Sequence, residues 1–298
     1  MKLYRKISIP YNPLSNVRVS HSGRHTGKGT SLMKMKKLGA VAASVAMVGA
    51  LALTGCGNSN TADTTEMKLI TDGKLTIGTA AEYEPFEYME DGEYKGFDIE
   101  LAQALADKLG LELQVENVDF DTITPGVASG TKYDMGIAAI TATPERKDEV
   151  DFTDSYYMDD QAVVTMKDNA DITKDNAMDE LNKEGVKIAV QSGSTAESFA
   201  KENFPNAELV PFKNATDCFS ALQANQAVAL VTNRSVAAQM VAGQFNNEQV
   251  VKQVSTGEEY AIAVAKDNPA LKDKLNEALK ELTDDGTVDS LMSKYNIK

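Results

Sequence analysis

Arg146 is the residue of this chain whose type and surroundings most favour chemistry with an anion. It lies in a stretch, residues 138–153, that reads AAITATPERKDEVDFT. A guanidinium is always charged, and its planar fork fits a carboxylate through two parallel hydrogen bonds. The hydroxyls of Thr141 and Thr143, with nearby backbone N–H groups, can complete a cradle for such an anion. The stretch therefore favours a site for a small carboxylic acid; the alternative is a surface arginine paired with a neighbouring acid.

The distribution of charge and of histidine excludes several classes of function. Residues 1–55 hold nine of the 30 Lys and Arg residues and none of the 44 Asp and Glu residues, so the rest of the chain is strongly acidic. Such a field repels phosphate backbones, which argues against a nucleic acid partner. Both histidines, His21 and His25, also lie in this first segment. The remaining chain therefore lacks the histidines of most nucleophile–base pairs and metal sites, and we expect neither a cofactor nor a metal.

The N-terminal segment has the form of a targeting signal. The basic run MKMKK at residues 33–37 precedes a 16-residue run of small and apolar residues, Leu38 to Leu53, which is followed by Thr54-Gly55-Cys56. This order resembles a bacterial lipoprotein signal peptide, which implies cleavage before Cys56, lipidation of its thiol and a location outside the cytoplasmic membrane. A membrane-spanning helix is the alternative, but the run is shorter than the roughly 20 residues that a span needs.

The same pattern sets the boundaries of this segment. We interpret residues 1–55 as the signal peptide with an extension upstream of Met33. Residues 56–68 are expected to be the lipidated cysteine and a small, polar, flexible tether. With Cys56 lipidated, Cys218 has no partner for an intramolecular disulfide, and we expect it to be a buried thiol.

The rest of the chain alternates short apolar runs with amphipathic ones. Leu75 to Thr79 is typical of a buried strand, and residues 98–109 place apolar side chains along one helical face. Pro144 is expected to begin a short helix that carries Arg146. The alternation predicts an α/β fold with mostly parallel sheets. Further strands are predicted at 111–116, 133–137, 161–166, 186–190, 228–231 and 260–264, and further helices at 122–129, 195–203, 215–225, 235–241, 270–282 and 288–295.

Several short motifs occur in order along this part of the chain. They are Tyr83 to Glu87 (YEPFE), Gly96 to Leu101 (GFDIEL), Val118 to Phe120 (VDF), Thr141 to Arg146 (TATPER), Asp151 to Thr153 (DFT) and Gly193 to Thr195 (GST). Together they resemble the family 3 extracellular solute-binding proteins, the amino-acid receptors of ABC importers. The resemblance implies a two-lobed periplasmic-binding-protein-like (type II) α/β fold, with two extended crossovers between the lobes and the ligand held between them. It places lobe 1 at 69–156 plus 259–298 and lobe 2 at 157–258.

The resemblance also implies how a ligand carboxylate is held. Arg146 resembles the family arginine that grips the α-carboxylate, with Thr141 and the backbone of Ala139 completing the contacts from lobe 1. From lobe 2, Ser194 and Thr195 resemble hydroxyl and N–H groups at a helix start that reach the same carboxylate on closure. The positive end of a helix dipole favours an anion there.

The ligand side chain is expected between two aromatic rings. Tyr83 and Phe120 occupy the corresponding family positions, and ordinary core packing is the alternative for both. Gln191 matches a lobe 2 position that contacts the ligand side chain, with an exposed strand-end amide as its alternative. The full set of expected ligand-binding residues is Tyr83, Phe120, Ala138, Ala139, Thr141, Arg146, Gln191, Gly193, Ser194, Thr195 and Asn233.

Two positions depart from the family pattern. The lobe 2 aspartate that pairs with the ligand ammonium falls at Asn233, which has an amide oxygen but no charge. Either another acid compensates, with Glu82 or Glu259 as candidates, or the ligand lacks a free ammonium. Ala80 stands where receptors for cationic amino acids carry an aspartate, so a cationic ligand would lose its counter-charge. We therefore expect a small or medium uncharged amino acid, or a related carboxylate.

The resemblance as a whole implies a binding protein rather than an enzyme. We expect a monomer, lipid-anchored on the extracytoplasmic face of a bacterial cell membrane, that binds an amino acid between its lobes and delivers it to ABC permease subunits. One alternative is a cyclohexadienyl-dehydratase-like enzyme on the same fold, with Glu82 or Glu259 as the general acid. Another is a ligand sensor that presents its closed form to a membrane receptor.

Overall fold

A computed structural model of the protein describes residues 66–297, all within one compact unit, Asn60–Lys298. The predictions for the signal peptide, for the lipidated Cys56 and for most of the tether lie outside the described residues. Within residues 66–297, no helix is both long enough and apolar enough to cross a membrane.

Lobe 1 is built on a five-stranded sheet in the order β5-β1-β6-β13-β7. β1 pairs in parallel with both β5 and β6, whereas β13 runs antiparallel to β6 and β7. Because β13 comes from the C-terminal part of the chain, the sheet joins two segments that are far apart in sequence. The bounds are β1 Lys74–Thr79, β5 Glu112–Asn117, β6 Met135–Gly136, β7 Asp151–Phe152 and β13 Ala263–Val264.

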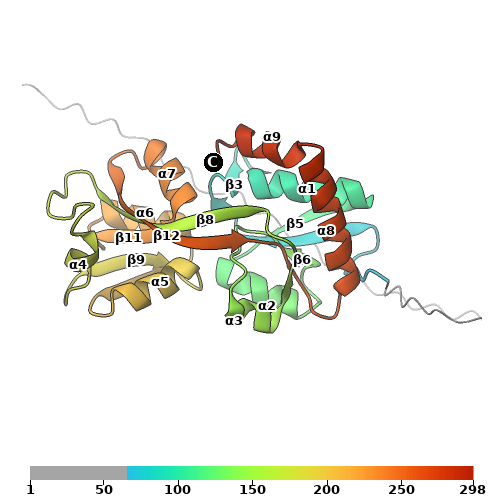
Figure 1. The fold of residues 1–298 in the computed structure, drawn as a ribbon, viewed down its shortest axis with the longest axis horizontal. Coiled ribbons are helices and arrows are strands. Elements are labelled where there is room, and N and C mark those ends of the chain that lie inside the picture. Colours follow the sequence, from blue (N-terminus) through green and yellow to red (C-terminus); the bar gives the residue numbers. More distant parts are fainter. Residues whose placement is uncertain (1–65, 298) are drawn as a thin grey trace, which may run out of the picture. The chain divides into compact units, whose positions relative to one another are not determined.

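Helices cover both faces of this sheet. Figure 1 shows α1, α8 and α9 on one side and α2 and α3 on the other. Leu101 and Leu105 of α1, and Leu275 of α8, are fully buried, and burying one such side chain stabilises the fold by about 1.5–3 kcal/mol. The bounds are α1 Phe97–Leu109, the 3-10 helix η1 Phe120–Thr122, α2 Ile123–Ala128, α3 Pro144–Glu149, α8 Pro269–Asp284 and α9 Thr287–Lys294.

Lobe 2 repeats this architecture with a second five-stranded sheet in the order β10-β9-β11-β8-β12. In Figure 1, α6 and α7 lie on one side of the sheet and α5 on the other. The strands are β8 Tyr157–Met166, β9 Lys187–Gln191, β10 Glu208–Phe212, β11 Ala229–Asn233 and β12 Glu248–Tyr260. The helices are α4 Ala177–Leu181, α5 Thr195–Asn203, α6 Ala215–Gln223 and α7 Arg234–Ala242.

The two lobes are joined by β8 and β12, which pair antiparallel and run from one lobe toward the other (Figure 1). β12 is irregular near its end, because its register against β8 shifts between Val254 and Glu258. Gly257, inside this shift, has φ 61, a left-handed conformation that glycine adopts without steric cost. The two-lobed α/β fold with extended crossovers that the sequence predicts is confirmed.

Several elements of the fold are absent from the sequence prediction. A separate three-stranded sheet, β2-β3-β4, joins Glu82–Tyr83, Glu87–Glu90 and Glu93–Lys95, whose charged sequences lack the apolar alternation of a buried strand. β10 also escapes prediction, because its short sequence ELVPF contains a proline at the edge of the sheet. Cys218 is 2% exposed, as expected of a buried thiol.

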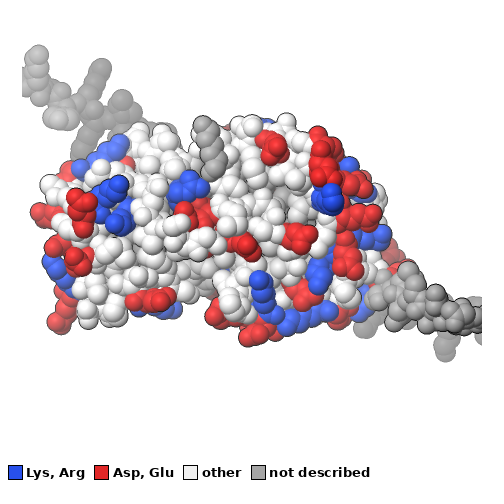
Figure 2. Space-filling view, viewed as in Figure 1, with Lys and Arg blue, Asp and Glu red and all other residues white. Residues whose placement is uncertain are grey.

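The acidic surface is offset locally by basic side chains. Figure 2 shows Asp and Glu side chains interspersed with Lys and Arg on the face in view. On α8, Lys280 pairs with Asp284 at 2.5 Å, and Lys108 of α1 pairs with Glu281 at 3.0 Å. All four side chains are at least one-third exposed, so water and salt screen each pair and it contributes little to stability. These charges keep the surface soluble rather than stabilise the fold.

Candidate functional site

Arg146 is positioned by the short helix α3. Pro144 occupies the first turn of α3, and the Thr143 side chain caps it by accepting a hydrogen bond from the Arg146 N–H at 3.3 Å. The guanidinium donates to two backbone carbonyls, through Nη1 to Thr141 at 2.8 Å and through Nη2 to Gly193 at 2.9 Å. Among residues 66–297, no Asp or Glu oxygen lies within 4.0 Å of it. Burial lowers the pKa of Arg146 from its usual value, so the charge is held where water stabilises it less.

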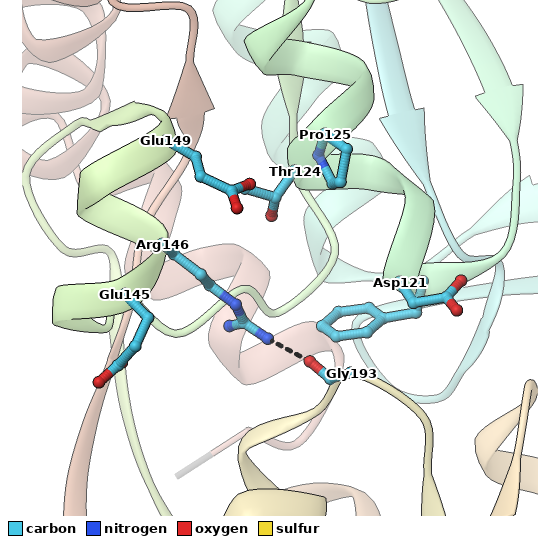
Figure 3. Close-up of a pocket in the computed structure, with 8 residues that line it drawn as sticks. Asp121, Thr124, Pro125, Glu145, Arg146, Glu149 and Gly193 are labelled. Carbon is cyan, nitrogen blue, oxygen red and sulfur yellow. Dashed lines mark hydrogen bonds between the residues drawn. The ribbon is translucent and has the colours of Figure 1, made fainter.

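A cavity of about 220 Å³ lies beside this guanidinium. Figure 3 shows Arg146 reaching across toward the Gly193 carbonyl, with Asp121 and Pro125 contributed by the opposite wall. The Arg146 Cζ lies over the Phe120 ring, 5.3 Å from its centroid, and such a cation–π contact contributes about 0.5–1 kcal/mol at an accessible site. Phe120 therefore lies against the cation expected to bind a carboxylate.

Lobe 2 approaches Arg146 through the loop before α5. Gly193 has φ 72, and a Cβ built on it would lie 2.9 Å from the Cβ of Asp121 in lobe 1, so only glycine permits this approach. The Ser194 hydroxyl donates to the Gln191 carbonyl at 2.7 Å and accepts from the Glu197 N–H at 3.1 Å. Both contacts are part of the cap of α5. The Thr195 hydroxyl points away from them, toward Glu258.

Tyr83 connects the lobes at the end of β11. Its hydroxyl donates to Asn233 Oδ1 at 2.8 Å and lies 3.1 Å from the Thr232 hydroxyl. The Tyr83 side chain is 7% exposed. The amide oxygen of Asn233 therefore already accepts one hydrogen bond from within the protein.

Gln191 and Glu82 form a second connection between the lobes. Gln191 Nε2 donates to Glu82 Oε1 at 2.9 Å, and the Thr216 N–H at the start of α6 donates to Glu82 Oε2 at 3.1 Å. Burial raises the pKa of Glu82 to about 6, and the hydrogen bonds from the start of α6 partly oppose this rise. The predicted side-chain residue Gln191 and the candidate acid Glu82 are thus brought together.

The alanines expected at the site are buried in lobe 1. Ala80 and Ala138 are 2% and 1% exposed and belong to one apolar cluster. Ala139 has a positive φ of 46, and its N–H donates to Asp98 Oδ2 at 2.7 Å. That N–H is therefore engaged within lobe 1, which leaves the carbonyl as the polar backbone group that Ala139 can offer.

Asp98 is itself part of a buried acid pair with Glu87. Both side chains are at most 1% exposed, and Asp98 Oδ2 also accepts from the Tyr156 hydroxyl at 2.9 Å. Asp98 Oδ1 and Glu87 Oε2 have no hydrogen-bond partner if both acids are ionised. Burial raises the pKa of Glu87 well above its usual value and that of Asp98 to about 6, and a shared proton between them satisfies both orphaned oxygens.

The acid nearest Asn233 is Glu258 on β12, which the sequence prediction missed. Glu258 is 8% exposed, and its Oε2 accepts from the hydroxyls of Thr141 at 2.6 Å and Thr195 at 2.7 Å, and from Asn233 Nδ2 at 3.2 Å. Its Oε1 accepts from Gln161 Nε2 at 2.5 Å. Residues expected to contact a ligand from both lobes thus converge on one carboxylate.

The neighbouring candidate Glu259 faces the other way. It is exposed and lines a separate cavity with Lys147 and Lys272, so it does not reach Asn233. Alternation along a strand from the buried Tyr260 would have placed Glu258, rather than Glu259, on the inward face. The alternation that places Glu258 inward is therefore present in the sequence, but it can be used only if the strand β12 is known to include these residues.

Comparisons with known proteins agree with this architecture. The model of the bacterial extracellular solute-binding proteins, family 3, matches residues 75–298. The arginine-binding extracellular protein ArtP of Bacillus subtilis is 34% identical over 250 residues, covering 82% of this chain and 92% of ArtP. A solved structure of an ancestral arginine-binding protein bound to glutamine has 38% identity and a TM-score of 0.71, covering 76% of this chain and 100% of that one.

A second solved structure is similar to the same degree. It is an ancestral amino acid-binding protein described as a precursor of cyclohexadienyl dehydratase, with 39% identity and a TM-score of 0.70. The match covers 75% of this chain and 95% of that one.

Proposed function

Since the chain belongs to the bacterial extracellular solute-binding proteins of family 3, we propose that it captures a small amino acid between its lobes for delivery to an ABC importer. The observation that carries the proposal is the state of Arg146. Its guanidinium is half-buried and donates only to the carbonyls of Thr141 and Gly193, one from each lobe. A half-buried cation without a carboxylate of the described chain within 4.0 Å is complementary to an anion, and it lies where both lobes can enclose one.

Binding is coupled to lobe closure in this proposal. A ligand stabilises the closed arrangement only through contacts that it makes there and not in an open one. Arg146 and Thr141 belong to lobe 1, whereas Thr195 and Asn233 belong to lobe 2, so a ligand that contacts all four links the lobes. The permease then recognises the closed protein, and the lipid anchor at Cys56 keeps the protein close to the permease.

The ligand that we propose is an uncharged amino acid. Ala80 stands where an acid would be expected for a cationic ligand, and both Ala80 and Ala138 are buried in an apolar cluster. A cationic side chain would therefore find no counter-charge at these two positions. The arginine-binding relative makes L-arginine the most informative competitor to test against L-glutamine.

The enzyme alternative rests on Glu82 and on the similarity to a dehydratase precursor. Burial raises the pKa of Glu82 to about 6, which would let it donate a proton near neutral pH. However, Gln191 and Thr216 both donate hydrogen bonds to Glu82, and such bonds stabilise its ionised form. An ionised carboxylate has no proton to donate and cannot act as a general acid. Turnover of prephenate or arogenate by the purified protein would establish the enzyme instead.

A thermal-shift screen tests the proposed function. The full chain, purified in detergent, is heated with each proteinogenic amino acid, with cystine, and with their oxo, N-acyl and deaminated relatives. At saturating concentration, the correct ligand should raise the melting temperature by about 5 °C or more. If no small carboxylic acid raises it, the proposal fails, whatever the role of any single residue.

A further inference from the structure

Glu258 is a buried carboxylate without a cationic partner. Its side chain is 8% exposed, yet among residues 66–297 no Lys or Arg nitrogen lies within 4.0 Å of it. The groups that donate to it are all neutral, and they come from Thr141, Gln161, Thr195, Asn233 and Thr256. Buried charges in proteins are normally paired with an opposite charge or with a metal. The protein itself supplies neither here, because no group of three metal-ligating side chains occurs in the described part of the chain.

Arg146 is a cation with no described carboxylate within 4.0 Å, and Thr141 contacts both Arg146 and Glu258. The Thr141 carbonyl accepts from Arg146 Nη1 at 2.8 Å, while its hydroxyl donates to Glu258 Oε2 at 2.6 Å. Arg146 and Glu258 are not paired with each other, since no nitrogen–oxygen distance between them is within 4.0 Å. The cleft therefore presents a cation and an anion that act on each other only beyond 4.0 Å, and both contact Thr141. This arrangement is complementary to a zwitterion.

We propose that Glu258 binds the α-ammonium of the ligand and thereby restricts the site to free α-amino acids. The inference rests on the proposed function and deepens it. Asn233 stands where the family resemblance expects an aspartate, and its Nδ2 donates to Glu258 Oε2 at 3.2 Å. In the family pattern the negative charge lies at the end of β11, whereas here it lies on the crossover strand β12. Glu258 is nevertheless within hydrogen-bond distance of Asn233, the residue at the family position.

The backbone of β12 holds Glu258 in this orientation. The register shift between Val254 and Glu258 is secured by Asp160 Oδ1, which accepts from the N–H groups of Thr256 at 2.9 Å and Gly257 at 3.1 Å. These hydrogen bonds lower the pKa of Asp160, so the anchor stays ionised. Beyond the shift the regular pairing with β8 resumes, with Glu258 and Tyr260 buried and Glu259 exposed. The carboxylate is therefore pre-positioned by the strand rather than by a flexible loop.

Titration calorimetry on three variants tests the inference. Glu258→Gln removes the charge and keeps the shape, Glu259→Gln is a matched control on the exposed face, and Glu258→Gln/Asn233→Asp returns the charge to β11. The probe is the L-amino acid that binds the wild type most tightly in the screen, with the same acid lacking its amino group. These pairs are L-glutamine with 4-carbamoylbutanoate and L-arginine with 5-guanidinopentanoate, or the equivalent for another amino acid.

The wild type should prefer the amino acid over its deaminated analogue by about 30-fold or more. Glu258→Gln should abolish this preference by weakening the amino acid alone, Glu259→Gln should keep it, and the double variant should restore most of it. Equal weakening of both ligands would indicate a structural role, and tighter binding of both would indicate that Glu258 competes with the ligand; either overturns the inference. A wild type that binds only oxo or deaminated acids also overturns it, yet leaves the proposed function standing.

Discussion

The two charged ends of the cleft are built in different ways. Arg146 is carried by a helix of one lobe, and its two hydrogen bonds go to backbone carbonyls, which keep it fixed without neutralising it. Glu258 is carried by a strand between the lobes, and neutral side chains from both lobes donate to it. The cation therefore stays with lobe 1 during any hinge motion, but its bond to Gly193, like the full set of donors around the anion, exists only when the lobes meet. Both ends should consequently report closure, and the arginine end should also report capture of a carboxylate.

The largest effect on binding is expected from removing the cation at the arginine end. Arg146→Ala deletes the cation that is expected to bind a ligand carboxylate from lobe 1, and we expect affinity to fall by about 100-fold or more. Unfolding should change little, because the guanidinium bonds only to exposed or neighbouring carbonyls. Calorimetry measures the affinity, and Lys147→Ala, at the next residue on α3, which is exposed, is the control. Unchanged affinity in Arg146→Ala would remove Arg146 from the site.

The same contrast explains how much of the site could be predicted from the sequence. The start of the helix that carries Arg146 is predicted from Pro144, which occupies its first turn, whereas the role expected of Arg146 comes from the family resemblance. Thr143, which is expected in an anion cradle, instead caps the helix. Helix α5 is likewise predicted with its observed bounds, Thr195–Asn203. Hydrogen bonds between neighbouring residues determine where both helices begin, so both can be predicted from the local sequence.

The inward face of Glu258 follows from alternation with the buried Tyr260, but the groups that it meets there do not follow from local sequence. Its donors come from distant elements, such as Thr141 of lobe 1 and Thr195 at the start of α5. The role of Asp98 was hidden for the same reason, since its partners Ala139 and Tyr156 come from other elements. The α/β alternation was predictable from periodicity and the two-lobed fold from the family resemblance, whereas the charge balance of the site required the tertiary contacts.

A smaller effect is expected from Gly193→Ala, which perturbs the contact between the lobes without removing either charge. Gly193→Ala places a Cβ against the Cβ of Asp121 across the lobes, where the two atoms would be only 2.9 Å apart. Gly185 has a similar positive φ of 81 with no atom within 4 Å, so Gly185→Ala carries the backbone strain without the clash. Each variant should lose about 1 kcal/mol of stability from that strain, and only Gly193→Ala should also lose about tenfold in affinity. Calorimetry and urea unfolding of both variants separate the two effects, and equal affinities would show that the lobes do not meet at Gly193 in the bound state.

The smallest effect on binding is expected from the acid pair beneath the site. A carboxyl group whose pKa is raised in the folded state gives stability that is present below its unfolded pKa and lost as the pH rises through the folded value. For Asp98 that window runs from 3.8 to about 6, and for Glu87 it begins at 4.5 and extends well above it. The wild type should therefore lose stability between mildly acidic and mildly alkaline pH.

Glu87→Gln should remove part of this loss, because a glutamine amide can donate to Asp98 at every pH, whereas Glu87 must keep a proton to do so. Its free energy of unfolding should match the wild type near about pH 4 and exceed it by about 1 kcal/mol or more near about pH 8. Urea unfolding at the two pH values measures this difference, with Glu93→Gln on the exposed strand β4 as the control. A variant no more stable than the wild type at the higher pH would contradict the prediction, because removing a carboxylate that Asp98 repels should stabilise the fold at that pH.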